Sequence, residues 1–530
     1  MRNQKLQPLV YALLIIAGIL IGQYKKISFT DLAEDVIYSN TSSENSKLNT
    51  IPYNNSENKK INNLLNRIQK HYVDTINTAD FEDKIINAIL NELDPHSAYI
   101  PVKNIQTVEE DMKGSFSGIG IEFNIIEDSI VVVSAISGGP SKKLAIQSGD
   151  RIIKVEEEDV ASTGIKNDGV IKRLRGEKGS IVNITIKRRG QTALMSFAIT
   201  RDDIPLYSVD VGIMLRNNIG YIKISRFSAT TYNEMMRKVK VLQKKGMDKL
   251  ILDLRGNPGG YLHIANQICD EFLKTGELIV FTKGSKRSRK ETFASKKGRL
   301  ENTQVITLID EGSASASEIV SGALQDNDRG IIIGRRSFGK GLVQEQIPMN
   351  DGSAIRLTTQ RYYTPSGRCI QKDYGENEKD YYLEQYTREE ETEFPDSLKF
   401  TTKKGRPVYG GGGITPDIII KRDTTLSYLQ VNLMISKGWL SEFCLRQSEN
   451  LKKENISNHK QIDIKNIYLK YAAFVQQKDA DFKMELGDIE LHYFKNLIKA
   501  SIARNLWGND IYYSILSQED EFVQKAINSF

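Results

Sequence analysis

Three loops in the middle of the chain carry residue types suited to hydrolytic chemistry. After the apolar run KLILDL come residues 255–260, RGNPGG. A Gly-Gly pair after a strand can turn backbone N–H groups toward a developing oxyanion, although a tight turn explains two glycines equally well. After the run TQVITLID come residues 311–318, EGSASASE. The small side chains leave a serine hydroxyl uncrowded at a strand-to-helix turn, where helix N–H groups favour negative charge.

A serine nucleophile needs a base, and the chain offers few candidates. Of the five histidines only His263 lies in the central part of the chain, so a Ser-His pair has one candidate base. Lysine is the alternative in Ser-Lys enzymes. Only about one free lysine in a few thousand is neutral at pH 7, but burial lowers a lysine pKa by up to about 3–5 units. Lys340 lies among Phe338, Leu342 and Val343, which suits a desolvated amine.

The same lysine closes the stretch GRRSFGKG, residues 334–341, which has the outline of a phosphate-binding loop. Such a loop requires Ser or Thr directly after the lysine, and a helix that begins there. Gly341 follows instead, and the pattern LVQEQI indicates a strand. The pattern therefore argues against nucleotide binding. A second non-catalytic interpretation applies to Ser315, because Ser-x-x-Glu up to Glu318 is also a helix capping box.

The elements that must position these loops follow from hydrophobic periodicity. From 204 to 423 strands alternate with helical stretches, which predicts an α/β core with a partly parallel sheet. Ahead of it, short strands with turn signals predict a compact β-rich module, and two helices precede that module from residue 59. Residues 424–530 are charged and helical in pattern, with no catalytic cluster.

The N-terminus has the pattern of an export signal or a short anchor. Residues 9–22, LVYALLIIAGILIG, are apolar and flanked by Lys and Arg. Leu20 occupies a position where a cleavage site requires a small residue, which favours an uncleaved anchor. The segment predicts a single-pass protein of the inner membrane with its catalytic part on the periplasmic side. Residues 27–58 are rich in Asn and Ser and predict a flexible linker.

Charge argues against a nucleic-acid partner. The net charge of the 530 residues is +6, and no dense basic block with interleaved aromatic residues occurs. No metal or cofactor is required by the residue types gathered in the three loops.

Taken together, the motifs resemble the C-terminal processing peptidases, or tail-specific proteases, over about residues 60–423. The motifs that carry the resemblance are DPHSAYI (94–100), GIGIEF (118–123), SGDRIIKV (148–155), LDLRGNPGG (252–260), EGSASASEIVSGALQD (311–326), GRRSFGKGLVQ (334–344), RYYTPSGRCIQ (361–371) and GGGITPDI (411–418). The resemblance implies a multidomain α/β protein with a ClpP/crotonase-like catalytic core and an inserted PDZ domain. The expected parts are an anchor (1–26), a linker (27–58), a helical region (59–102), the PDZ domain (103–203), the Ser-Lys peptidase core (204–423) and a helical extension (424–530).

The resemblance also implies roles for individual residues. Ser315 is the expected nucleophile, Lys340 its general base and Gln344 the polar residue that orients the lysine. The expected oxyanion hole combines the N–H of Ala316 with one from Gly259 or Gly260.

Within the PDZ domain, the resemblance implies capture of a substrate's C-terminal carboxylate. The residues expected to do this are Gly118, Ile119, Gly120, Ile121 and, as a sensor of the bound state, Arg175. The expected substrates are proteins with apolar C-termini, and an adaptor protein or a second copy of the chain are further candidate partners. The main rival is a non-enzymatic PDZ adaptor tethered to a membrane, with a degenerate protease core.

Overall fold

The computed structural model describes residues 58–136, 138–295, 297–375, 378–388, 395–422 and 429–530. The chain divides into two units, residues 1–78 and 79–530. Helix α2 (Asn58–His71) belongs to the first unit, and α3 (Thr78–Asn91) begins at the boundary. The predicted linker lies almost wholly outside the described residues. The sheets, the catalytic loops predicted above and the C-terminal helices all lie in the second unit.

The predicted membrane placement is corrected here. A helix needs roughly 20 mostly apolar residues to span a bilayer. In the ranges given above, no helix meets that requirement. Helix α14 (Asp488–Trp507) has the length, with 20 residues, but its sequence DIELHYFKNLIKASIARNLW carries charges along its whole course. Residues 9–22, on which the anchor was predicted, lie outside the described residues, and the described helices do not support a single-pass inner-membrane localisation.

The predicted peptidase core is built on a mixed sheet in the order β10-β11-β12-β15-β16-β21. Only β10 is antiparallel, and the other five strands run parallel, as the alternation of strands and helices predicts. The strands are β10 (Val209–Met214), β11 (Ile219–Ile224), β12 (Lys249–Asp253), β15 (Gln304–Ile309), β16 (Ile331–Gly334) and β21 (Ile418–Ile419). The three glycine- and serine-rich loops leave the carboxyl ends of the adjacent strands β12, β15 and β16. Their residues are therefore brought to one edge of the sheet.

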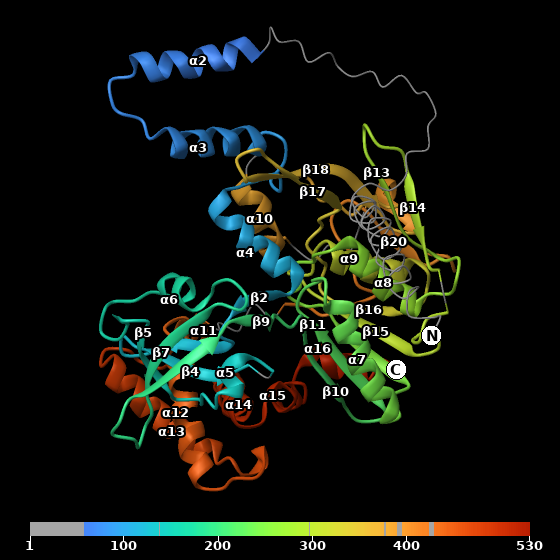
Figure 1. Ribbon diagram of the computed structural model, residues 1–530. Helices are drawn as coiled ribbons and strands as arrows, with labels where there is room; N and C mark the ends of the chain where they lie inside the picture. The colour runs from blue at the N-terminus through green and yellow to red at the C-terminus, as the bar shows by residue number, and fades with distance from the viewer. Residues whose placement is uncertain (1–57, 137, 296, 376–377, 389–394, 423–428) are drawn as a thin grey trace, which may run out of the picture. The chain divides into compact units, whose positions relative to one another are not determined.

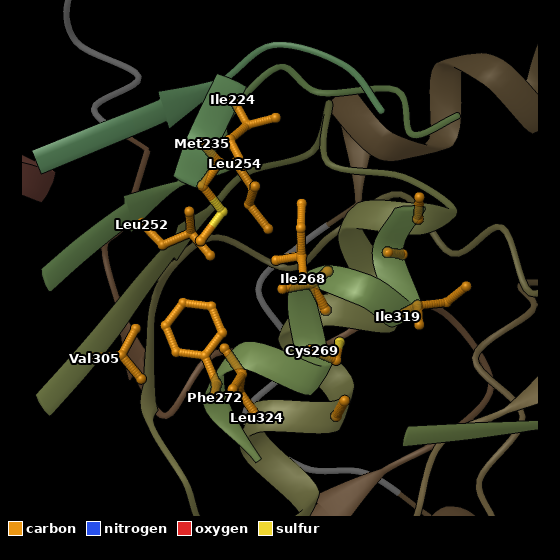
Figure 2. Packing of buried hydrophobic residues seen from close by; sticks show 14 of the residues in the cluster. Ile224, Met235, Leu252, Leu254, Ile268, Cys269, Phe272, Val305, Ile319 and Leu324 are labelled. Carbon is orange, nitrogen blue, oxygen red and sulfur yellow. The ribbon is translucent and has the colours of Figure 1, made fainter. Parts of the chain in front are cut away.

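Three helices cover one face of this sheet: α7 (Thr231–Lys244), α8 (Leu262–Phe272) and α9 (Ala316–Asp326) (Figure 1). Side chains of the strands and helices point toward one another in a dense apolar core, with the ring of Phe272 near Val305 and Leu324 (Figure 2). Burial of each such side chain stabilises the folded state by about 1.5–3 kcal/mol. The core fixes α9, which begins directly after Ser315.

The loop that contains Lys340 continues into a second sheet, whose strands pair antiparallel. Its order is β1-β18-β13-β14, with β17 paired to β18. The strands are β1 (Ala98–Ile100), β13 (Leu278–Lys283), β14 (Lys290–Phe293), β17 (Leu342–Pro348) and β18 (Ala354–Tyr363). Strand β17 begins two residues after Lys340, and β1 follows the DPHS motif. Pairing of β1 and β17 on opposite edges of β18 brings residues 94–97 and 340–344 together.

The β-rich module forms its own sheet, β3-β4-β5-β7-β8, around a separate apolar cluster. Its elements are β2 (Ser115–Gly118), β3 (Ile121–Ile125), β4 (Ile130–Ala135), α5 (Pro140–Lys143), β5 (Arg151–Val155), β6 (Glu158–Asp159), α6 (Asn167–Leu174), β7 (Ile181–Lys187), β8 (Met195–Thr200) and β9 (Asp202–Pro205). Helix α4 (Val102–Lys113) precedes it. Strand β3 is an end strand of this sheet, which leaves its outer edge open to an added strand.

The remaining elements follow the core. Between β18 and the C-terminus lie α10 (Glu378–Thr387), η1 (Asp396–Leu398), β19 (Lys399–Thr401), β20 (Pro407–Tyr409), α11 (Leu429–Ser436), α12 (Trp439–Lys453), η2 (His459–Gln461), α13 (Ile464–Lys478), α14, α15 (Asn509–Leu516) and α16 (Glu521–Ile527). Helices α11 to α14 share an apolar cluster of their own, whereas α16 packs into the cluster of the catalytic sheet. The helical pattern of residues 424–530 is thus present from Leu429 onward.

Candidate active site

Ser315 occupies a strained turn between β15 and α9. Its backbone has φ 54° and ψ −111°, a conformation that residues other than glycine rarely adopt and that often marks functional sites. Its N–H donates to the Glu318 carboxylate at 2.8 Å, and its carbonyl oxygen lies 3.1 Å from the Tyr362 hydroxyl, which also lies 2.7 Å from Lys340 O. The residue is half-buried. These contacts hold the turn, and its helix N-terminus favours negative charge nearby.

Gly259 and Gly260 lie against that turn. A Cβ atom on Gly259 would stand 2.8 Å from Ser315 Cβ and 2.9 Å from Ala316 N, so only glycine fits. A Cβ atom on Gly260 would stand 2.2 Å from the Phe227 carbonyl oxygen. Phe227 pins the loop, since its N–H donates to Gly259 O and its carbonyl accepts from Tyr261 N, each at 2.8 Å. Gly259 is therefore packed against Ser315 and Ala316, and Gly260 follows it in a loop that Phe227 holds in place.

The two glycines differ in what their N–H groups do. The Gly259 N–H donates to Asn257 Oδ1 at 2.9 Å and is occupied. In the parallel bridge between Phe227 and Gly260, Phe227 bonds to the residues on either side of Gly260. The N–H of Gly260 itself therefore points away from Phe227. The Gly260 N–H is thus the better donor for a ligand of the two.

Lys340 is half-buried, and its amine donates to one polar side chain within the described residues. Its Nζ donates to Gln344 Oε1 at 2.8 Å, and Gln344 Nε2 donates to His96 O at 2.7 Å. Burial, with a smaller contribution from the positive charge of Arg356, lowers the pKa of Lys340 to about 8. Asp94 and Glu318 oppose that shift. A pKa near 8 leaves about a tenth of the amine neutral at pH 7, several hundred times the fraction of a free lysine.

Glu318 joins the serine and lysine loops. This buried carboxylate accepts from the N–H groups of Ser315 (2.8 Å), Gly339 (2.7 Å) and Lys340 (2.9 Å) and from the Ser337 hydroxyl (2.6 Å). Burial raises the pKa of Glu318, while these four donors act in the opposite direction. The sequence identified the Ser315–Glu318 pair as a capping box, but its bonds to the lysine loop have no local sequence signal.

The DPHS motif forms the outer wall of the lysine site. Asp94 accepts from His96 N, Ser97 N and Ser97 Oγ at 2.7–2.8 Å, which fixes the carbonyl that receives Gln344. His96 Nε2 lies 2.7 Å from the Tyr381 hydroxyl. Burial first, and the charge of Lys340 second, lower the pKa of His96 to about 4, so its ring is neutral at pH 7. In the sequence this motif carries only a family resemblance, and it predicts no role for Asp94 or His96.

The geometry gives little support to a phosphate-binding loop or to a Ser-His pair. The N–H groups of Gly339 and Lys340, which would cradle a phosphate, are occupied by the Glu318 carboxylate. The His263 ring lies beside the Tyr261 ring, with centroids 5.0 Å apart and the ring planes tilted by 42°. Within the described residues, neither His263 nor Lys340 hydrogen-bonds to the Ser315 hydroxyl, but only the lysine shares a buried carboxylate with the serine.

The PDZ residues lie around the start of β3. Gly118 ends β2, Ile119 is buried, Gly120 adopts φ 74° and Ile121 opens β3. Gly118 forms an isolated antiparallel bridge with Arg175. The Arg175 guanidinium lies 4.2 Å over the Phe116 ring and donates to Glu110 of α4 at 2.6 Å. The predicted carboxylate-binding residues and Arg175 are thus neighbours.

Comparison with known proteins shows the family and the PDZ domain. The family model described as Peptidase family S41 matches residues 218–381, and the PDZ domain model matches residues 117–199. A carboxy-terminal-processing protease of Bartonella bacilliformis is 38% identical over 317 residues, covering 59% of this chain and 72% of the relative. The carboxy-terminal processing protease CtpB of Bacillus subtilis is 36% identical over 319 residues, covering 59% of this chain and 65% of the relative.

Among solved structures, a photosystem II D1 C-terminal processing protease is 23% identical, with a TM-score of 0.36, and covers 68% of this chain and 86% of that one. The two matched models and the identity to curated relatives define the class, a serine peptidase of family S41 with a PDZ domain. The chain belongs to the carboxy-terminal processing proteases. The C-terminal helices from α11 onward lie outside both matched ranges.

Proposed function

We propose that this chain is an endopeptidase that cleaves polypeptides through an acyl-enzyme, with Ser315 as nucleophile and Lys340 as general base. The observation that carries the proposal is the shared Glu318 carboxylate, which ties the serine turn and the lysine loop together beside a lysine of lowered pKa. Gln344 orients the amine. Substrate binding then has to bring the amine within hydrogen-bond reach of Ser315 Oγ, as such contacts often tighten only in the complex.

The chemistry is acyl transfer. Lys340 Nζ accepts the Ser315 hydroxyl proton as Oγ bonds to the peptide carbonyl carbon. The N–H groups of Ala316 and Gly260 are the donors for the negative oxygen. The protonated amine then gives its proton to the leaving nitrogen as the peptide bond breaks. Lys340 next activates a water that cleaves the ester, and Ser315 is restored.

The test is covalent labelling of Ser315 by a fluorophosphonate, alongside cleavage of an unfolded protein. We expect Ser315→Ala and Lys340→Ala each to abolish cleavage with an unchanged melting temperature. Ser321→Ala is the matched control, because its buried hydroxyl donates within α9 to the Ser317 carbonyl at 2.9 Å and should leave cleavage intact. Full activity in the Lys340 variant, or its loss only in His263→Ala, would refute the assignment.

We further propose that the PDZ domain binds the free, apolar C-terminus of the substrate along β3. The donors are the backbone N–H groups of Gly118 to Ile121, and Arg175 stands beside them. A peptide with a free C-terminus should be cleaved faster than the same peptide with an amidated end. Equal rates would argue against carboxylate capture. A chain that binds such peptides but never labels with the fluorophosphonate would favour the adaptor alternative.

A further inference from the structure

The last helix of the chain packs beneath the catalytic loops. Helix α16 buries Phe522, Val523 and Ala526 in a cluster that includes Ile251, Leu308 and Ile333 of β12, β15 and β16. Because successive strand residues point to opposite faces, Ile251 faces away from the cluster that holds Leu250 and Leu252. Helix α16 therefore covers the sheet face opposite to α8 and α9.

Phe522 contacts the first residues of two catalytic loops. The Arg255 guanidinium lies 4.6 Å from the centre of the Phe522 ring, and that of Arg335 lies 4.9 Å from it. Arg255 begins the loop that ends in Gly259 and Gly260. Arg335 begins the loop that ends in Lys340. Cation–π contacts of this kind contribute about 0.5–2 kcal/mol each, the larger values when the cation is desolvated.

Arg335 extends the contact to the third loop. Its Nε forms an ion pair with Glu311 at 2.8 Å, and Glu311 lies four residues before Ser315. Contacts from Phe522 thus reach the oxyanion loop directly, the lysine loop directly and the serine loop through one ion pair.

Asp520 fixes the most buried of these arginines. Its two carboxylate oxygens accept from Arg255 at 3.0 and 2.8 Å, while Asp253 accepts from the same guanidinium at 3.0 and 2.6 Å. The Asp520 Oδ1 atom also caps α16 by accepting from Phe522 N. A buried arginine needs several acceptors, since an unpaired buried donor costs about 1–3 kcal/mol. Loss of Asp520 would leave one side of Arg255 unsatisfied, four residues before Gly259.

We infer that Asp520 and Phe522 are positioning residues for the reaction, which hold the three catalytic loops in register through Arg255 and Arg335. The inference rests on the proposed function, since it assigns work in that reaction to a helix outside the matched family ranges. It places the end of the chain within the catalytic unit. A displacement of about 1 Å in an oxyanion donor lowers turnover by about 10²-fold.

The test compares substitutions in the full-length chain. Asp520→Asn keeps an equally good helix N-cap but removes the charge that faces Arg255. We expect kcat on a fluorogenic peptide to fall about tenfold or more with KM within about twofold, and fluorophosphonate labelling of Ser315 to slow in parallel. Asp520→Glu, which restores the charge, should recover part of kcat.

Asp510→Asn is the matched control, because Asp510 pairs with Lys238 at 3.5 Å from the neighbouring helix α15. It should leave kcat unchanged. A lower melting temperature with unchanged kcat in Asp520→Asn, or equal losses in both variants, would overturn the inference. Ser315→Ala distinguishes failure of the proposed function from failure of this inference. If the Ser315→Ala variant cleaves the peptide as the parent chain does, the proposed function is refuted, and the inference with it.

Discussion

In the proposed mechanism the chemistry depends on the amine of Lys340, and the protonation of that amine sets the pH dependence. A general base must be neutral, and burial lowers the pKa of Lys340 to about 8. Below that pH the neutral fraction falls tenfold per unit, so kcat/KM should rise with pH and level off above about 8. A pH–rate profile measured from pH 6 to 10 checks this. A plateau already reached near pH 6 would contradict a lysine base.

The positive charge of Arg356 is a separate lever on the same amine. It disfavours a second positive charge and so helps to lower the pKa of Lys340. Arg356→Gln should therefore raise that pKa and move the acid limb of the profile to higher pH, by a few tenths to about one unit. Arg361→Gln on the same strand β18 is the control and should leave the limb in place. A limb that moves equally in both variants would argue against the local charge effect.

At the scale of elements, the loop after β12 needs glycine because it packs closely against the Ser315 turn and leaves no room for a Cβ atom at Gly259. Gly259 has φ 100°, and an added Cβ would collide with Ser315 Cβ at 2.8 Å. Gly259→Ala should lower kcat by about 10²-fold and cost roughly 1–3 kcal/mol of stability. Peptide kinetics and thermal unfolding measure both effects.

Gly256→Ala is the matched control in the same loop. Gly256 also has a positive φ, 67°, but an added Cβ would meet nothing within 4 Å. It should show the backbone strain without the loss of kcat. Equal losses of kcat in both variants would mean that loop strain, and not contact with Ser315, controls activity.

The sequence anticipated these elements where the pattern is local. Apolar runs followed by Gly- and Ser-rich loops predicted the strand ends, whereas the grouping of Ser315, Lys340 and Gln344 was implied by the resemblance to a family. The contacts that complete the site join distant segments. His96 O accepts a hydrogen bond from Gln344, 248 residues away, and Asp520 accepts one from Arg255, 265 residues away. No periodicity in either segment signals such a partner, because the pairing depends on strand order and helix packing.

At the scale of the whole chain, apolar burial is divided among separate clusters. One cluster lies between the catalytic sheet and helices α7 to α9, and another lies among α11 to α14. The sequence predicted a helical C-terminal extension as one part. The structure divides it, because α16 belongs to the cluster of the catalytic sheet. The sequence reads as charged and helical both in α11 to α14 and in α16, so the pattern alone could not assign these helices to different clusters.

Separate clusters predict separate losses of structure. Phe272 and Phe494 are both fully buried, the first in the catalytic cluster and the second among α11 to α14. Truncation of a buried phenylalanine costs about 3–5 kcal/mol, and local unfolding follows cooperative units. Phe272→Ala should raise hydrogen exchange in α8 and α9 and weaken fluorophosphonate labelling of Ser315. Phe494→Ala should raise exchange in α12 to α14 while labelling persists. Phe293→Ala, at a 47% exposed position on β14, should change neither. Equal loosening of α9 in both core variants would show instead that the clusters unfold as one unit, with the helical extension inseparable from the catalytic fold.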